Sequence, residues 1–325
     1  MKIVIDVMGS DKGSDALVTG AVRALNEFTD LEVVLVGDGG EIEGILAREN
    51  AKGNSRIRVV HTTEVIDMHE SPTLAFRRKK DSSMSVMLDL LQKGEGDAGL
   101  SAGSTGAVLA GSTFVLKRIK GIRRPALAPC LPTKSGYSLL IDCGANVVCN
   151  PEDMVQFGFM GSCYMRKLMG IENPRVGLIN NGAEDTKGTP MHVEAYQMLQ
   201  QAHEQGLINF VGNIEGRDIA LGGADVLVTD GFTGNVVLKT YEGLGLYLVS
   251  ILKGMFYNMN KLVQCNSSFL FCQLPQQISA SVLICRLVTF SDRCTIPEFL
   301  PLVQILSLIL TAFIAPFFVF RLTTR

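Results

Sequence analysis

The stretch Ser138-Leu139-Leu140-Ile141-Asp142-Cys143-Gly144-Ala145-Asn146 is a short apolar run that ends in an acidic residue, a glycine and an amide. Five further apolar runs end in similar residues, within 2–11, 99–106, 176–185, 208–213 and 225–235. Short apolar runs separated by segments of helical length are typical of buried parallel strands. The sequence therefore predicts an α/β fold with a mostly parallel, doubly wound sheet.

The segments around these runs predict a regular alternation of strands and helices. Strands are expected at 2–6, 32–37, 57–61 and 98–102, and helices at about 14–28, 40–50, 73–93, 107–116 and 233–252. In the helix expected at 73–93, Met84, Met87, Leu88 and Leu91 recur at the spacing of one helical face. That face is predicted to lie in the core.

The residues that follow the strands are the first candidates for a site. In parallel sheets, ligands bind beyond the carboxyl ends of the strands, so these residues are expected to converge on one edge of one sheet. A carboxylate at a strand end can orient a donor, hold a metal or simply cap a helix. The candidate catalytic residues are Asp6, Asp11, Asp142, Asn146 and Asp230.

The loop Ser101–Ala107 has the composition of an anion-binding turn. Its glycines allow a ligand to approach the backbone, and the start of the following helix offers free N–H groups. No lysine follows as in a Walker A motif, and Ala102 replaces the first glycine of a nucleophile elbow. An ordinary glycine turn with a helix cap is the alternative interpretation. Candidates for binding an anionic ligand are Gly9, Ser101, Gly103, Ser104, Thr105, Gly106, Asn180, Asp185, Lys187, Gly231, Thr233, Gly234 and Asn235.

Two basic clusters stand out in a chain whose net charge is −2. One is expected to open the helix at 73–93, which is an unfavourable position for cations in the helix dipole. Such clusters either form a solvated face or attract an anionic partner. The cluster residues are Arg77, Arg78, Lys79 and Lys80 in the first, and Lys117, Arg118, Arg123 and Arg124 in the second.

Composition narrows the class of protein. The 325 residues carry a near-neutral charge and few aromatic residues, which gives no support for nucleic-acid binding. Asp6 and Asp11 interrupt the N-terminal apolar run, so no secretory signal is expected and a cytoplasmic protein is indicated. The histidines and cysteines lack the spacing of a metal site or a disulfide framework. No G-x-G-x-x-G motif is present. We expect no metal and no cofactor.

The composition changes abruptly near Asn258. All 33 glycines lie at or before Gly254, and residues 259–325 carry a net charge of +3. The run 299–320 is almost wholly apolar. The tail 259–325 is interpreted as an out-of-frame translation, with a transmembrane span at 299–320 or an unusual buried domain as the alternatives. Residues 1–258 are expected to form the α/β domain.

Several motifs of residues 1–258 together resemble the bacterial phosphate acyltransferase family. They are 5–11, 101–107, 124–129, 142–149, 160–162, 184–188 and 230–240. Single residues depart from the family's usual pattern, such as Ser10, Ser104 and Val148, and the family's last segment is not recognisable after Asn258.

The resemblance implies a Rossmann-like, three-layer architecture similar to that of isopropylmalate dehydrogenase. It implies transfer of a fatty acyl group from acyl carrier protein to inorganic phosphate, and the basic clusters would then meet the acidic carrier. The product would be an acyl phosphate for a downstream glycerol-3-phosphate acyltransferase. A homodimer and peripheral membrane association follow from the resemblance alone. The alternatives are an inactive frameshifted member of the family, an isopropylmalate-type dehydrogenase and an integral membrane protein.

Overall fold

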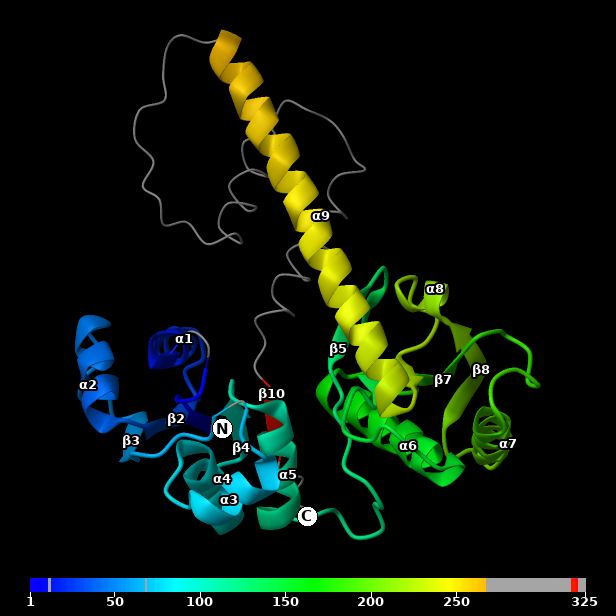
Figure 1. Ribbon diagram of the computed structural model, residues 1–325, viewed down its shortest axis with the longest axis horizontal. Helices are drawn as coiled ribbons and strands as arrows, with labels where there is room; N and C mark the ends of the chain where they lie inside the picture. The colour runs from blue at the N-terminus through cyan, green and yellow to red at the C-terminus, as the bar shows by residue number, and fades with distance from the viewer. Residues whose placement is uncertain (11–12, 68, 267–316, 321–325) are drawn as a thin grey trace. The chain divides into compact units, whose positions relative to one another are not determined.

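The computed structural model describes residues 1–10, 13–67, 69–266 and 317–320, which form two compact units. The first contains Met1–Pro125 and a short C-terminal strand, and the second begins at Ala126. Each unit has its own five-stranded, mostly parallel sheet with helices on it (Figure 1). The predicted α/β class is confirmed. The expectation of a single sheet edge is wrong, because apolar runs reveal that strands are buried but not which strands pair.

The first unit is a doubly wound sheet with the order β10-β4-β1-β2-β3. Strands β1 (Lys2–Asp6), β2 (Glu32–Gly37), β3 (Ile57–His61) and β4 (Ala98–Ser101) are parallel, and β10 (Phe317–Phe320) pairs antiparallel with β4. The helices are α1 (Gly13–Glu27), α2 (Gly39–Arg48), α3 (Pro72–Arg78), α4 (Ser83–Lys93) and α5 (Thr105–Val115).

Alternation along the strands divides the core of this unit between two faces. Ile5 and Leu35 are buried in a cluster with side chains of α1 and α2. Their neighbours Val4 and Val34 are buried in a second cluster with side chains of α4 and α5. Successive strand residues point to opposite faces, so continuous apolar strands require helices on both sides.

The second unit has the strand order β5-β6-β9-β7-β8. Strands β6 (Gly136–Ile141), β7 (Arg175–Asn180), β8 (Asn209–Glu215) and β9 (Val226–Val228) are parallel, and β5 (Cys130–Thr133) is an antiparallel edge strand. The helices are α6 (Pro151–Leu168), α7 (Pro190–Glu204), the short α8 (Gly216–Ile219) and α9 (Gly231–Asn266).

The core of the second unit follows the same rule. Leu139 and Val228 pack in a cluster with α6 and α7, whereas Leu140 and Leu227 pack in a cluster with the first turns of α9. In Figure 1, α9 begins at this sheet and extends away from it. The start of α9 is therefore fixed by the sheet.

Two predicted helices differ from the structure. The segment 73–93 forms α3 and α4, because the Ser82 side chain accepts the Ser85 N–H at 3.3 Å and starts a new helix. The apolar spacing of 84–91 is confirmed, since these residues are buried. The final helix begins at Gly231 and continues to Asn266, well past Leu252.

The expectations for the tail fall mainly outside the described residues. Only 259–266, at the end of α9, and 317–320, in β10, belong to the described part, and the rest of the candidate span 299–320 does not. Across the described residues, none of the helices combines the length and the apolar run needed to cross a bilayer.

Close packing of α6 on the second sheet gives a stability prediction. A Cβ atom at Gly161 would lie 2.3 Å from Cγ1 of Val226, a buried and stiff side chain. We expect Gly161→Ala to lower the free energy of unfolding by about 1–3 kcal/mol. Urea unfolding measures this change. Gly243→Ala on α9, with nothing within 4 Å, is the control and should raise stability by about 1 kcal/mol. Equal effects of the two substitutions would contradict the packing argument.

Candidate active site

The first group of candidate residues lies where β1 and β4 end side by side. Asp6 and Ser101 are register partners at the carboxyl ends of these parallel strands. The chain leaves β1 toward β2 on one side, whereas β4 lies on the other side of β1. This is a topological switch point, the place where open α/β sheets bind ligands.

The Asp6 carboxyl group organises this edge. Its side chain is 1% exposed, the Ser101 hydroxyl donates to Oδ2 at 2.7 Å, and the Met8 N–H donates to Oδ1 at 3.1 Å. Burial raises the pKa of Asp6, while hydrogen bonds from Ser83, Ser101 and Met8 partly oppose that rise. Ser101 in turn accepts the Gly103 N–H at 3.1 Å. Asp6 therefore fixes the shape of the glycine-rich turn.

Two glycine turns meet beside this carboxyl group. Gly9 has a left-handed φ of +74°, and a Cβ atom there would lie 3.8 Å from the Gly103 Cα. The side chain of Ser104 caps α5 by accepting the Ala107 N–H at 3.4 Å. Within the described residues, the N–H groups of Ser104, Thr105 and Gly106 have no protein acceptor. The start of α5 thus presents three adjacent donors, as an anion site requires.

The second group of candidates surrounds Asp142 after β6. Its buried carboxylate accepts four hydrogen bonds: from the N–H groups of Leu127 and Ala145 at 2.9 and 3.2 Å, and from the backbone and side-chain nitrogens of Asn146 at 2.7 and 3.0 Å. A carboxylate has about four acceptor positions, so those of Asp142 are filled. Asp142 and Asn146 shape this loop, and a catalytic role for either stays a prediction.

Asp230 organises the start of α9 in the same unit. Its Oδ1 accepts the N–H groups of Phe232 and Thr233 at 3.0 and 2.9 Å, and its Oδ2 accepts the Thr233 hydroxyl at 2.8 Å. The Gly231 N–H binds the Asn146 carbonyl at 2.8 Å, and the Gly234 N–H binds the Asp230 carbonyl. The first amides of α9 are therefore already paired, unlike those of α5.

Glycines 231 and 234 are needed here for close approach. A Cβ atom at Gly234 would lie 1.9 Å from the Asp142 carbonyl oxygen, and one at Gly231 would lie 2.6 Å from that of Asn146. Asn235 faces the same loop, because a Cβ atom at Gly144 would be 3.1 Å from its Nδ2. The structure thus brings 142–146 and 230–235 together.

The loop after β7 is held by a pair of asparagines. The Asn180 side chain donates to the Lys187 carbonyl at 3.0 Å and to Oδ1 of Asn213 at 3.1 Å, and Asn213 donates to the Glu184 carbonyl at 2.7 Å. Asp185 and Lys187 lie exposed on this loop. Asn180 therefore stabilises the conformation of this loop.

Sequence reasoning missed three residues of these sites. Ser83 is buried and hydrogen-bonds Asp6. His192 is half-buried, and its pKa is lowered by burial, an effect partly opposed by Asp230. Asn213 follows the apolar run 208–211 and a glycine, which predicts the end of a strand, but β8 continues beyond a bulge at Gly212, where φ is +93°. The renewed apolar run at Ile214 was the available signal.

The candidate Asp11 lies outside the described residues.

The basic residues 77–80 end a helix, which corrects the expectation that they begin one. Arg77 and Arg78 occupy the last turn of α3, where the helix dipole favours cations. Lys79 pairs with Glu70 and donates to the Val65 carbonyl at 2.7 Å. Lys80 is exposed, as are Lys117, Arg118, Arg123 and Arg124 of the second cluster. The Arg118 side chain donates to the Arg123 carbonyl. Lys79 is thus mainly structural.

The buried thiols are poor nucleophiles. Burial, reinforced by nearby Asp142, raises the pKa of Cys143 to about 12 and that of Cys149 to about 11. The thiolate is the reactive form of cysteine, so neither thiol supplies one at neutral pH. Among the described residues, no group of three His, Cys, Asp or Glu side chains is arranged to hold a metal ion.

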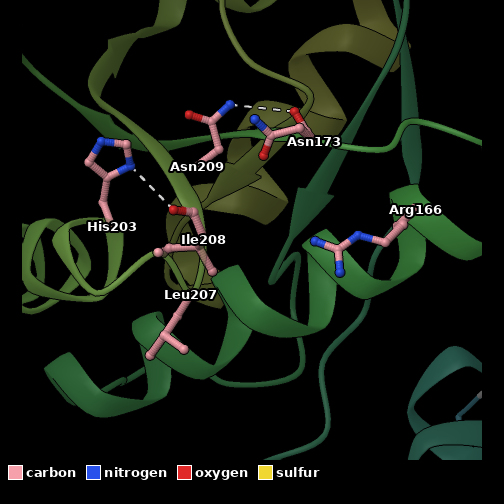
Figure 2. Close-up of a pocket in the computed structure, with 7 residues that line it drawn as sticks. Arg166, Asn173, His203, Leu207, Ile208 and Asn209 are labelled. Atoms are coloured by element: carbon pink, nitrogen blue, oxygen red, sulfur yellow. Dashed lines mark hydrogen bonds between the residues drawn. The ribbon is translucent and has the colours of Figure 1, made fainter.

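A polar cavity of about 260 Å³ lies at the amino ends of β7 and β8, with Asn173, Ile208 and Asn209 in its lining (Figure 2). The candidate residues follow the opposite, carboxyl ends of the strands. Arg166 and His203 project from the last turns of α6 and α7, and the His203 ring contacts the Ile208 carbonyl at 3.2 Å. Helix carboxyl ends carry partial negative charge, which favours the Arg166 guanidinium at the end of α6. The cavity is not part of the candidate site.

Solved structures define the class of fold. The EutD phosphotransacetylase from Staphylococcus aureus superposes with a TM-score of 0.55 over 75% of this chain and 82% of its own, at 17% sequence identity. At this identity the likeness concerns the fold alone, a Rossmann-type α/β fold.

Sequence relatives identify the family. The model of the fatty acid synthesis protein family matches residues 1–264. The phosphate acyltransferase of Acetivibrio thermocellus is 48% identical over 255 residues, which are 78% of this chain and 74% of its own. That of Bacillus cereus strain B4264 is 44% identical over 300 residues, 92% of this chain and 84% of its own. The chain belongs to this family and is an acyltransferase of fatty acid and phospholipid synthesis.

The buried Asp6 carboxyl group predicts a pH dependence of stability. Its pKa in the folded chain lies above the ordinary value of 3.8. The folded state then holds a proton that the unfolded chain has released, so the free energy of unfolding falls as pH rises from about 4 through the folded-state pKa. Asp6→Asn removes this titration. Urea unfolding at a series of pH values should show the stability of the native chain relative to the variant decreasing with pH. A difference that stays constant or grows would contradict this.

Proposed function

We propose that this chain transfers a fatty acyl group from the thioester of acyl carrier protein to inorganic phosphate, which yields an acyl phosphate for phospholipid synthesis. The names of its relatives support phosphate as the acceptor. The observation that carries the proposal is the start of α5, where three adjacent unpaired N–H groups follow the Gly103 turn that the Asp6–Ser101 pair holds. Thr105, the first residue of α5, adds a hydroxyl donor. Phosphate oxygens would accept from these donors.

The contrast between α5 and α9 favours one of the two candidate phosphate sites. The first amides of α9 are paired with Asp230 and Asn146, so an anion there would have to displace internal hydrogen bonds. An anion bound to the amides of Ser104, Thr105 and Gly106 would displace no internal hydrogen bond. We therefore assign phosphate to the turn 101–106 and assign Gly231, Thr233 and Gly234 to the support of the Asp142 loop.

The chemistry requires orientation and charge stabilisation more than a protein nucleophile. A phosphate oxygen attacks the thioester carbonyl carbon, a tetrahedral oxyanion forms, and the carrier thiolate leaves as the acyl phosphate is completed. Fixed backbone donors lower the barrier by holding the phosphate and by stabilising developing negative charge. The raised pKa values of Cys143 and Cys149 argue against an acyl-enzyme on either thiol.

Asp6 acts in this scheme as a positioning residue. It binds Ser101, Ser101 binds the Gly103 N–H, and the turn that carries Thr105 follows. Phosphate is itself a nucleophile at neutral pH, so the reaction needs no general base from Asp6, Asp142 or Asp230. The filled acceptor positions of Asp142 agree with this.

The carrier protein would dock on the cations of the first unit. Arg77, Arg78 and Lys80 are exposed and form no ion pair within the described residues, so their charge is available to an acidic partner. Lys117, Arg118, Arg123 and Arg124 belong to the second basic cluster of the same unit. Complementary charge steers association and gives it a strong dependence on salt.

Assembly and membrane contact would use α9. Leu244, Leu246, Tyr247 and Leu248 are each about half exposed or more on this helix, which is a large apolar area for solvent. This area supports a homodimer formed through α9, or a peripheral membrane contact that would deliver acyl phosphate to a downstream glycerol-3-phosphate acyltransferase.

Thr105→Val tests the phosphate site. The substitution keeps the shape of the side chain but removes a hydroxyl donor to a charged ligand, and such a bond contributes about 1.5–3 kcal/mol. We expect the KM for phosphate to rise about tenfold or more, with little change in stability. Steady-state kinetics at varied phosphate measures this.

Thr113→Val on the same helix is the matched control, because the Thr113 hydroxyl is bonded to the Leu109 carbonyl. Its KM for phosphate should stay at the native value. An unchanged KM in Thr105→Val would remove phosphate from this turn.

Charge reversal tests carrier docking. We expect Arg77→Glu with Arg78→Glu to weaken binding of unacylated carrier protein about tenfold and to reduce the salt dependence of that binding. The control is Arg166→Glu with Lys167→Glu, which reverses two cations in the last turn of α6 in the other unit. Both pairs end a helix, so their effects on the dipole match. Equal loss of carrier binding in the two double variants would contradict docking on α3.

A further inference from the structure

Helices α3 and α5 of the first unit lie side by side and in the same direction. A Cβ atom at Gly106 would lie 3.4 Å from Pro72, and one at Gly111 would lie 2.2 Å from Cζ of Phe76. The first turns of the two helices therefore meet at the glycine-rich turn, and the contact at Gly111 follows one to two turns later. Gly111 allows this approach because it has no side chain.

An apolar cavity of about 270 Å³ opens beyond that contact. It is lined by Thr73, Phe76, Arg77, Phe114 and Val115. Phe114, which lines the cavity, is 58% exposed, and Leu74 of α3 is 50% exposed. Exposed aromatic and aliphatic side chains around a hollow are a common mark of a ligand-binding surface.

We propose that this α3–α5 cavity binds the alkyl chain of the fatty acyl group that is being transferred. The inference rests on the proposed function, because it places the acyl group of that reaction. Thr105, at the phosphate end, and Phe114, at the cavity, are nine residues apart on one helix, which corresponds to about 14 Å along its axis. An acyl group whose carbonyl lies at the start of α5 can extend along the helix and reach the cavity with its chain.

The chemistry of the lining favours an alkyl chain over the other occupants. Phe76, Phe114 and Val115 offer no hydrogen-bond donors, and Thr73 and Arg77 are the polar side chains of the lining. A docked protein helix would need a contact of roughly 800 Å² on each partner, far more than this small hollow provides. Arg77 suits the cavity mouth, because its methylene stem can cover an apolar chain while the guanidinium stays in water.

Phe114→Gln tests the cavity with a probe that needs no turnover. The full chain is titrated with a fluorescent long-chain polyene fatty acid. We expect Phe114→Gln to raise the Kd about tenfold. Phe28→Gln is the matched control, since Phe28 is a similarly exposed phenylalanine of the same unit (53%) that does not line the cavity. Its Kd should equal that of the native chain. A Kd for Phe114→Gln that is no higher than for Phe28→Gln overturns the proposal.

Transfer kinetics and carrier binding separate this inference from the proposed function. If phosphate-dependent transfer occurs, Phe114→Gln should raise the KM for a long-chain acyl carrier and leave that for a butyryl carrier unchanged. Equal effects on both donors overturn the cavity while the transfer function stands. Phe114-dependent binding of the fatty acid without any transfer supports the cavity and contradicts the function. Equal weakening of acylated and unacylated carrier binding identifies a protein-docking surface and overturns the alkyl-chain assignment.

Discussion

A carboxylate buried at the end of a parallel strand must find hydrogen-bond donors, and this constraint shapes both candidate sites. Asp6 meets it with two serine hydroxyls and one amide, and Asp142 with four donors from its own loop and from Leu127. Asp230 draws on the first turn of α9. An unpaired buried carboxylate would be strongly destabilising, so the loops adopt the conformations that supply the donors.

The same constraint distinguishes helix starts whose amides hold the protein's own loops from those whose amides can bind a ligand. Where a carboxylate caps the helix start, as Asp230 does for α9, the amides are already used. At α5 the Ser104 side chain caps the Ala107 amide, so the three amides before Ala107 stay unpaired. The glycine-containing loops 101–106 and 230–235 both lead into a helix, but only the first leaves its amides unpaired. The proposed phosphate site therefore lies at 101–106. The adjoining α3–α5 cavity gives that site an apolar extension suited to the acyl chain of the proposed reaction.

At a few positions, glycine allows two elements of the fold to pack more closely than a side chain would permit. Gly234 allows α9 to start directly on the Asp142 carbonyl, and Gly111 allows α3 to lie against α5. In the sequence these positions look like ordinary turn or helix glycines. Their importance comes from atoms that are distant along the chain: Asp142 precedes Gly234 by ninety-two positions and Phe76 precedes Gly111 by thirty-five.

The sequence by itself determined the strand and helix alternation, the α/β class and the position of the polar residues at strand ends, because periodicity and turn composition are local. It also determined the family through long motifs in order. It did not determine that 73–93 would break at Ser82, because side chains of both α3 and α4 enter the same core and the break depends on the cap that the Ser82 side chain forms. Only the tertiary structure decided that the strands form two sheets, that Asn213 supports Asn180, and that α5 rather than α9 has unpaired amides. Those outcomes depend on which distant donors and acceptors meet, and that information is not present in any one stretch of the chain.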